Sequence, residues 1–191
     1  MAPMSLADSD RESLHQVARN SIQYTLQQGR NVEFEKTLKL QDYSAELQQH
    51  RATFVTLHIE AELRGCIGTL QAHQPLVFDV SHNARSAAFQ DPRFAPLTIQ
   101  EFPQLDIHIS ILGLPELMHF SSEQDLINQI RPGVDGLILT AGSHRGTFLP
   151  SVWESLSTPQ EFWSHLKLKA GLPANYWNDE IKVERYTTES F

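Results

Sequence analysis

Residues 52–70 read ATFVTLHIEAELRGCIGTL, and this stretch predicts a pair of strands. Residues 52–60 are rich in β-branched and aromatic side chains, a composition that is typical of a strand. Residues 63–70 form a second apolar run, and only a short turn near Glu60 and Ala61 separates it from the first. We therefore expect two neighbouring strands that run antiparallel.

The LRGCIGT segment inside the second run contains the only cysteine of the chain. Because alternate residues of a strand share a face, Arg64, Cys66 and Gly68 are expected on one side of the sheet. An arginine on the same face as a thiol would favour the thiolate, which is the nucleophilic form.

Two interpretations of this segment follow. Glycines within a strand usually mark a bulge or the close approach of a ligand or another backbone. In the first interpretation Cys66 and Arg64 are catalytic residues of a reactive pocket, and the substrate lies against Gly65, Gly68 and Thr69. In the second, Cys66 is a small buried hydrophobic residue in a sheet where the glycines provide no side chains for packing.

Hydrophobic patterns predict further elements on both sides of this strand pair, because apolar residues recur at helical or at alternating spacing. The expected helices cover about 9–28, 76–90, 125–130 and 159–170, and the expected strands 105–112, 136–140 and 183–187. The first and last helices follow capping-box sequences that begin at Ser9 and Thr158, and Gly29 offers the first helix its end. Residues 142–146 are expected to form a polar loop, and residues 31–51 have no clear pattern.

The order of these elements favours an α+β fold over a doubly wound α/β sheet, because antiparallel-looking strand pairs mix with helices of irregular spacing. The length of 191 residues fits a single domain, residues 1–191, with the first helix packed on its body.

Composition narrows the class of protein. Fifteen Lys and Arg against 23 Asp and Glu give a formal charge of -8, which disfavours binding to nucleic acid. A lone cysteine excludes an internal disulfide and indicates a reducing compartment. We find no secretory signal and no apolar run of the roughly 20 residues that span a bilayer, so we expect a cytoplasmic protein that does not engage a membrane.

The sequence indicates neither a metal site nor a bound cofactor. Nine histidines are present, but no HExxH sequence places two of them on one helix face. No glycine-rich nucleotide-binding loop occurs either.

Three polar residues in and after the helix that follows Pro75 are further candidates. Arg93 is a candidate for binding an anionic group of a substrate, because a guanidinium is a planar, bidentate donor. The alternative is that Asp91 and Arg93 lock the end of this helix into the sheet by hydrogen bonds. Asn83, on the polar side of the helix, is either a substrate-binding residue or a solvated one.

His108 shares a strand face with Asp106 and Ser110. It is a candidate general base for Cys66, on the condition that the two strands are neighbours and face the same cleft. Arg145, in the polar loop, is a candidate for closing over a ligand, although as part of a solvated turn it needs no function.

The LRGCIGT segment and the DPRF sequence at 91–94 resemble the AMMECR domain family, also called protein A of the AmmeMemoRadiSam system. Further matches follow in the family's order, namely ISIL at 109–112, GVDG at 133–136, TFLPSVW at 147–153 and KAGL at 169–172. The resemblance implies a compact α+β fold of a larger and a smaller lobe, with the Arg-Gly-Cys segment facing the cleft between them. His108 departs from the acidic residue that the resemblance implies at its position, so it inherits no family role.

Two functions from different classes remain open. In the first, the protein is a thiol-dependent enzyme or covalent carrier that acts on a small organic, anionic substrate through Cys66. In the second, it is a binding or adaptor module. The family name reflects gene neighbourhoods shared with a Memo-type protein and a radical SAM enzyme, which are therefore candidate partners.

Overall fold

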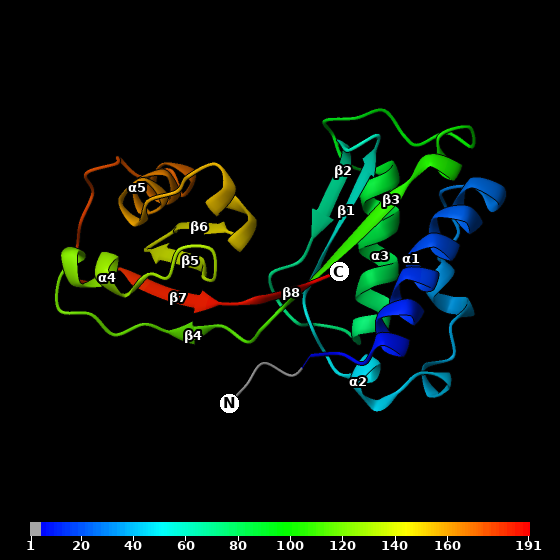
Figure 1. The fold of residues 1–191 in the computed structure, drawn as a ribbon, viewed down its shortest axis with the longest axis horizontal. Helices are drawn as coiled ribbons and strands as arrows, with labels where there is room; N and C mark the ends of the chain where they lie inside the picture. Colours follow the sequence, from blue (N-terminus) through cyan, green and yellow to red (C-terminus); the bar gives the residue numbers. More distant parts are fainter. Residues whose placement is uncertain (1–4) are drawn as a thin grey trace. The chain divides into compact units, whose positions relative to one another are not determined.

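The computed structural model describes residues 5–191, which divide into two compact units (Figure 1). The first unit comprises the chain up to Leu112 together with Glu189–Phe191, and the second comprises Gly113–Thr188. Each unit has its own four-stranded antiparallel sheet with helices, so the expected α+β class is confirmed. Residues 1–4, which the single-domain prediction includes, lie outside the described residues.

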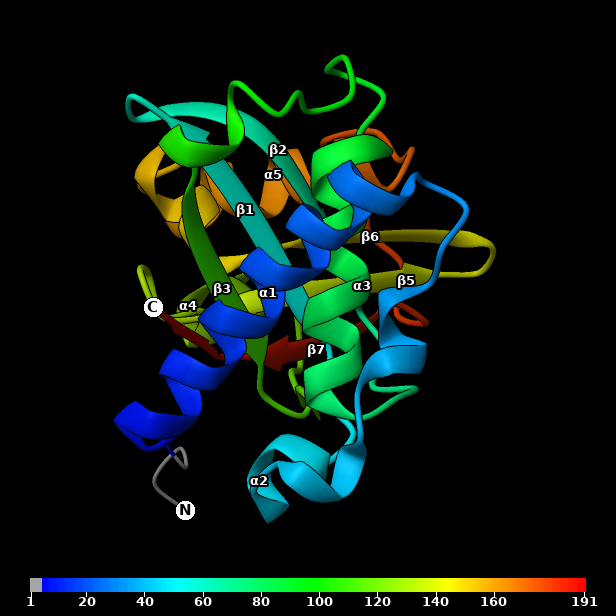
Figure 2. The same cartoon turned by 90° about the vertical axis from the view of Figure 1, so that its right-hand side faces the viewer.

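The sheet of the first unit has the strand order β2-β1-β3-β8. Its strands are β1 (Thr53–Ile59), β2 (Glu62–Gly68), β3 (Asp106–Leu112) and β8 (Thr188–Ser190). Helices α1 (Asp8–Gln28) and α3 (Leu76–Phe89) pack against each other and cover one face of this sheet (Figure 2). Alternate residues of β1 and β3 are buried beneath the helices, among them Val55, Leu57, Ile107 and Ile109.

The strand pair predicted for residues 52–60 and 63–70 is confirmed, with β2 at the edge of the sheet. β1 and β2 run antiparallel and are joined by Glu60 and Ala61, whose φ angles are 52° and 66°. This left-handed conformation matches the twist of a tight hairpin but is unfavourable for residues with a Cβ. The register shifts between Leu57 and His58, which leaves Arg64 as the extra residue of a β-bulge.

Helix α1 begins at Asp8, so Ser9 lies inside it and the capping box predicted at Ser9 is wrong. A long-range contact holds the start of the helix instead. The carboxylate of Glu189 accepts hydrogen bonds from the main-chain N–H of Leu6 at 3.0 Å and from the Arg11 guanidinium at 2.8 Å.

The first helix ends at Gly29 as expected, with a φ of 93° at that glycine. The segment after it contains two 3-10 helices, η1 (Phe34–Thr37) and η2 (Leu40–Asp42), and the short helix α2 (Ala45–Gln48). Another 3-10 helix, η3 (Phe102–Gln104), leads into β3.

The sheet of the second unit has the strand order β4-β7-β5-β6. Its strands are β4 (Glu116–Leu117), β5 (Gly136–Ala141), β6 (His144–Phe148) and β7 (Lys182–Tyr186), and its helices are α4 (Glu123–Gln129), η4 (Pro150–Glu154) and α5 (Pro159–Lys169). The rings of Trp153 and Phe162 stack in its core at 3.9 Å between centroids. Thr158 caps α5 as predicted, because its Oγ1 accepts the Glu161 N–H at 3.3 Å.

The polar loop predicted at 142–146 is wrong in extent. Only Gly142 and Ser143 form a turn, and the following residues continue into β6, which pairs with β5. Glycine and polar residues dominate this stretch, so the pattern that identifies a strand is missing.

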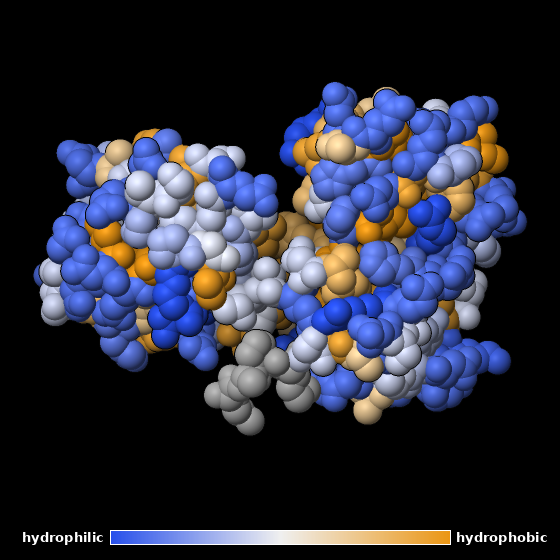
Figure 3. All heavy atoms as spheres, viewed as in Figure 1, coloured by the Kyte–Doolittle hydropathy of each residue, from blue (hydrophilic) through white to orange (hydrophobic). Residues whose placement is uncertain are grey.

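No helix within residues 5–191 is long and apolar enough to cross a bilayer. On the face drawn in Figure 3, hydrophilic residues predominate and apolar residues form separate patches.

Candidate functional site

Cys66 lies on the face of the first unit's sheet that is turned away from α3. Its neighbour Gly65 faces α3, where an added Cβ would lie 2.1 Å from the carbonyl oxygen of Ala87, and successive strand residues point to opposite faces. Thr56 of β1 is directly opposite Cys66, and the distance from its Oγ1 to Cys66 Sγ is 3.2 Å. Cys66 as a residue is partly exposed, and its thiol is hydrogen-bonded to a hydroxyl group.

The main chain of Cys66 is held at the outer edge of β2 by the residues that follow α3. Its N–H donates to Asp91 Oδ2 at 2.9 Å, and its carbonyl oxygen accepts from Arg93 Nη2 at 3.4 Å. Arg93 Nη2 also donates to Asp91 Oδ2 at 2.7 Å. These two side chains thus fix the end of α3 to the edge of the sheet by hydrogen bonds, which is the structural alternative predicted for them.

The hydrogen bonds between Asp91 and Arg93 also favour the charged forms of both side chains. The hydrogen bond from Arg93 holds the pKa of Asp91 well below its usual range, and in return Asp91 raises the pKa of Arg93. The Arg93 side chain remains 55% exposed, so binding of an anion by its free donors stays a prediction.

Arg64 does not lie beside the thiol as the simple alternation predicts, because the bulge interrupts the alternation at this residue. Its Nε donates to Glu101 Oε1 at 2.8 Å, and its Nη2 donates to Glu101 Oε2 at 3.1 Å and to the Ala95 carbonyl oxygen at 2.9 Å. The hydrogen bonds from Arg64 lower the pKa of Glu101 to about 2. With its side chain 14% exposed and its charge paired, Arg64 fixes the loop after α3 to β2.

Both glycines of the segment are explained by close approach of the protein's own atoms. Gly65 allows the main chain of α3 at Ala87 to reach the sheet, and a Cβ at Gly68 would lie 2.2 Å from the ring of Phe54. A ligand is therefore not needed to account for either glycine, and a role for them in substrate binding stays a prediction.

Thr69 and Asn83 belong to a buried polar network around Asp79, which is fully buried in α3. Asp79 Oδ2 accepts hydrogen bonds from Thr69 Oγ1 at 3.0 Å, from Asn83 Nδ2 at 3.0 Å and from Thr53 Oγ1 at 2.7 Å. Asn83 is 1% exposed, so the solvated position predicted as its alternative is wrong. The network joins α3 to β1 and to the end of β2.

His108 lies in the same row of the sheet as Cys66, but not next to it. Thr56 of β1 pairs with Cys66 on one side and with His108 on the other, so the two strands in question are not neighbours. Two strand spacings separate their main chains by about 10 Å. His108 Nε2 instead lies 2.9 Å from Asp106 Oδ2, and its ring meets the edge of the His58 ring at 5.2 Å between centroids. The condition for a direct general base is not met.

Arg145 lies in the second unit, on the exposed surface of β6 opposite Thr140. Within residues 5–191 it forms no ion pair or side-chain hydrogen bond. Its role in closing over a ligand stays a prediction.

The surroundings of the thiol combine a hydroxyl group with a guanidinium–carboxylate pair. No group of three or more potential ligands within residues 5–191 is placed to hold a metal ion. Cys66 has a hydroxyl partner in Thr56 and a nearby cation in Arg93. The sequence analysis missed Thr56, although the alternating pattern of its strand places this residue on the same face as Cys66. It also missed Glu101, because a residue in a loop follows no periodic pattern that would indicate its partner.

Comparison with known proteins extends the likeness over almost the whole chain. A model of the AMMECR1 family matches residues 15–191. Protein MJ0810 of Methanocaldococcus jannaschii is 37% identical over 164 residues, which cover 82% of this chain and 80% of that relative. A protein of Thermotoga maritima is 40% identical over 149 residues, which cover 76% of this chain and 80% of the relative. The crystal structure of the uncharacterized protein PH0010 from Pyrococcus horikoshii has a TM-score of 0.84 at 33% identity, and the match covers 97% of this chain and 92% of that one.

Proposed function

The chain belongs to the AMMECR1 family, and from this premise we propose that it is a cytoplasmic thiol-dependent enzyme or covalent carrier whose nucleophile is Cys66. The observation that supports the proposal is the partly exposed Cys66 on the sheet face turned away from α3, with its sulfur 3.2 Å from the hydroxyl of Thr56. A cysteine that served only as core would be expected among apolar neighbours.

The proposed step is attack of the Cys66 thiolate on an electrophilic carbon of a small organic substrate. An S–C bond forms, the bond between that carbon and its leaving group breaks with its electron pair, and the thiol proton passes to water. The hydroxyl of Thr56 orients the sulfur, and the exposed donors of Arg93 bind an anionic group of the substrate. Arg64 is a positioning residue in this scheme, because its charge is already paired with Glu101.

Alkylation by iodoacetamide tests the reactivity of the thiol, since Cys66 is the only cysteine and each adduct replaces one iodide. We expect the native protein to be labelled at a rate within about tenfold of the urea-unfolded chain, because Cys66 is partly exposed in the folded protein. The Cys66→Ser variant is the blank. Thr56→Val, which removes the hydroxyl but keeps the shape, should change the rate, whereas Thr140→Val in the second unit should not. Labelling that appears only on unfolding contradicts the proposal.

One observation favours the adaptor function as the alternative. Arg64 of the LRGCIGT segment is already paired with Glu101, and Arg93 is paired with Asp91. Such pairs can serve to hold loops in place without any catalytic role. In this alternative the protein docks a Memo-type or radical SAM partner. Stoichiometric co-purification of such a partner that survives Cys66→Ser, together with unchanged activity of Cys66→Ala in cells, would select this function over the enzyme.

A further inference from the structure

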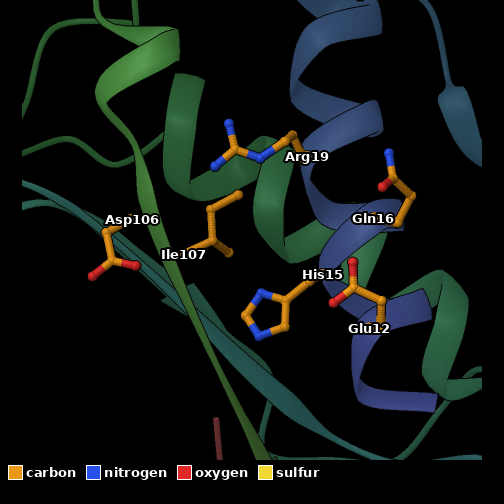
Figure 4. A pocket seen from close by; sticks show the side chains of 6 residues that line it. All are labelled: Glu12, His15, Gln16, Arg19, Asp106 and Ile107. Carbon is orange, nitrogen blue, oxygen red and sulfur yellow. The ribbon is translucent and has the colours of Figure 1, made fainter. Parts of the chain in front are cut away.

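A hollow of about 300 Å³ lies in the first unit between α1 and the segment 34–43, away from the thiol. Residues of α1 that line it include Glu12, Gln16 and Asn20, and the opposite wall is formed by Phe34, Leu38 and Tyr43. In Figure 4, His15 and Arg19 project from α1 toward β3, whereas Gln16 lies on the other side of the helix. The volume is at the lower end of the roughly 300–1,000 Å³ of ligand pockets, so the hollow suits a small molecule.

The two described ends of the chain lie on the opposite side of α1 from this hollow. The guanidinium of Arg11 lies 5.5 Å from the ring centroid of Phe191, and the N–H of Leu6 donates to Glu189 at 3.0 Å. Each helical residue advances about 100° around the axis, so Asn20, which lines the hollow, lies about half a turn around the helix from Arg11. The segments that enter α1 and follow β8 are therefore held away from the hollow.

The wall opposite α1 is fixed by contacts outside the hollow. Glu35, the neighbour of Phe34, accepts a hydrogen bond from Nη1 of Arg85 in α3 at 2.6 Å. Leu38 and Tyr43 pack against the core of the first unit. Because these residues are already in place, a ligand that enters the hollow does not have to order them.

The charge of the lining is negative. Glu12 is its only charged residue, and Glu12 forms no ion pair with another residue within 5–191. The lysines of the opposite segment do not line the hollow, and one of them, Lys36, is paired with Glu33 at 2.7 Å. A cationic ligand therefore finds a carboxylate and no competing cation.

The other lining residues favour one kind of cation. Burial raises the pKa of Tyr43, so its phenol is uncharged at neutral pH, and Phe34 is a second aromatic residue of the lining. Gln16 Nε2 donates to Asn20 Oδ1 at 2.9 Å, so these two amides already bond to each other. A primary ammonium has three N–H donors to satisfy, whereas a quaternary ammonium has none and is bound by aromatic faces and negative charge.

We propose that this hollow binds a small quaternary ammonium compound, with its methyl groups against Phe34 and Tyr43 and its charge balanced by Glu12. The rest of the ligand is short and uncharged, because an anionic group would meet the carboxylate and no cation. Leu38 and Val17 contact its alkyl part. This inference does not depend on the reactivity of Cys66.

A titration of the ¹⁵N-labelled full chain with choline tests the inference by NMR. We expect saturable amide shifts confined to residues 12–20 and 34–43. The neutral analogue 3,3-dimethylbutanol has the same shape with carbon in place of nitrogen, so it should bind about tenfold more weakly, because it loses both the cation–π contact and the attraction to the carboxylate. Ethanolamine and phosphocholine should also bind more weakly than choline. Tighter binding of phosphocholine would identify a phosphorylated headgroup as the ligand and contradict the proposal.

Matched variants locate the binding on the protein. Glu12→Gln should weaken choline about threefold and leave 3,3-dimethylbutanol unchanged, whereas the exposed control Glu180→Gln should change neither. Tyr43→Leu should weaken choline about fivefold, and Tyr43→Phe, which keeps the ring, should bind it as the wild type does. The inference is overturned if millimolar choline causes no saturable shift, if the shifts lie outside the hollow, or if the neutral analogue binds as well as choline.

Discussion

Replacing Gly65 by alanine tests whether this glycine serves the packing of α3 or a ligand. The new Cβ would lie 2.1 Å from the carbonyl oxygen and 3.0 Å from the carbonyl carbon of Ala87, both of which are main-chain atoms in a helix. Because a helix backbone cannot rotate away as a side chain does, α3 would have to retreat by about 1 Å from the sheet. That movement would loosen the contacts of the apolar face of α3 with β1 along its length.

The magnitude follows from the cost of overpacking a core. A forced shift of this kind costs about 3 kcal/mol, at the upper end of the usual range, and the lower entropy of the unfolded alanine chain returns about 0.5–1 kcal/mol. We therefore expect a net loss of about 2 kcal/mol, which lowers the melting temperature by about 4–8 °C. Gly68→Ala is the matched control. The three atoms nearest to its Cβ belong to the side chain of Phe54, which can change rotamer whereas a helix backbone cannot, so its loss should be less than half as large.

The assay combines circular dichroism with tryptophan fluorescence. All three tryptophans, Trp153, Trp163 and Trp177, lie in the second unit, so fluorescence follows that unit whereas far-ultraviolet dichroism follows both. A Gly65→Ala variant that melts at the wild-type temperature, or that is less affected than Gly68→Ala, would refute the packing explanation. The approach of a ligand would then be the better reason for a glycine at this position.

Three further predictions concern single contacts. The pKa of Glu101 is lowered from 4.5 to about 2 by Arg64, so the stabilisation it provides is complete above about pH 4.5 and is lost as the pH falls toward 2. Urea unfolding between those pH values should therefore show a smaller loss of stability in Glu101→Gln than in the wild type; equal losses would contradict this. Ala61→Gly should raise the melting temperature by about 2–4 °C, because it removes about 1 kcal/mol of strain from a residue with a φ of 66°, and a decrease would argue against strain at this turn. Glu123→Gln should destabilise the protein by about 3 kcal/mol in fluorescence-monitored unfolding, because it leaves the ammonium of Lys167, which is 2% exposed, without its anionic partner; the test fails if the midpoint is unchanged.

Local patterns in the sequence were sufficient where one segment alone decides the structure. The strands around the Glu60–Ala61 turn follow from β-branched residues and a short connection, and Thr158 caps its helix through a contact with Glu161, only three residues away. The same capping pattern failed at Ser9, because α1 already begins at Asp8. Its start is held by Glu189, far along the chain, which accepts a hydrogen bond from the main-chain N–H of Leu6. A pattern of four residues contains no information about a partner 180 positions away.

Residues of the candidate site were harder to place, because their roles depend on partners from other elements. Arg64 was expected beside the thiol, but a one-residue bulge turned it to Glu101. Asn83 was expected at the surface or against a substrate, but Asp79 and Thr53 draw it into a buried network. Each side chain follows the hydrogen-bond partner that burial makes obligatory, and that partner is visible only in three dimensions.

The sequence by itself determined the α+β class, most helices and strands and the family, because these depend on periodicity and on motifs that are local in the chain. Only the tertiary structure decided what surrounds Cys66, which is a hydroxyl on β1 and a carboxylate-guanidinium clamp beyond α3. The physical reason is that alternation along a strand fixes which face a side chain occupies, whereas bulges, strand order and helix packing fix which groups meet it there.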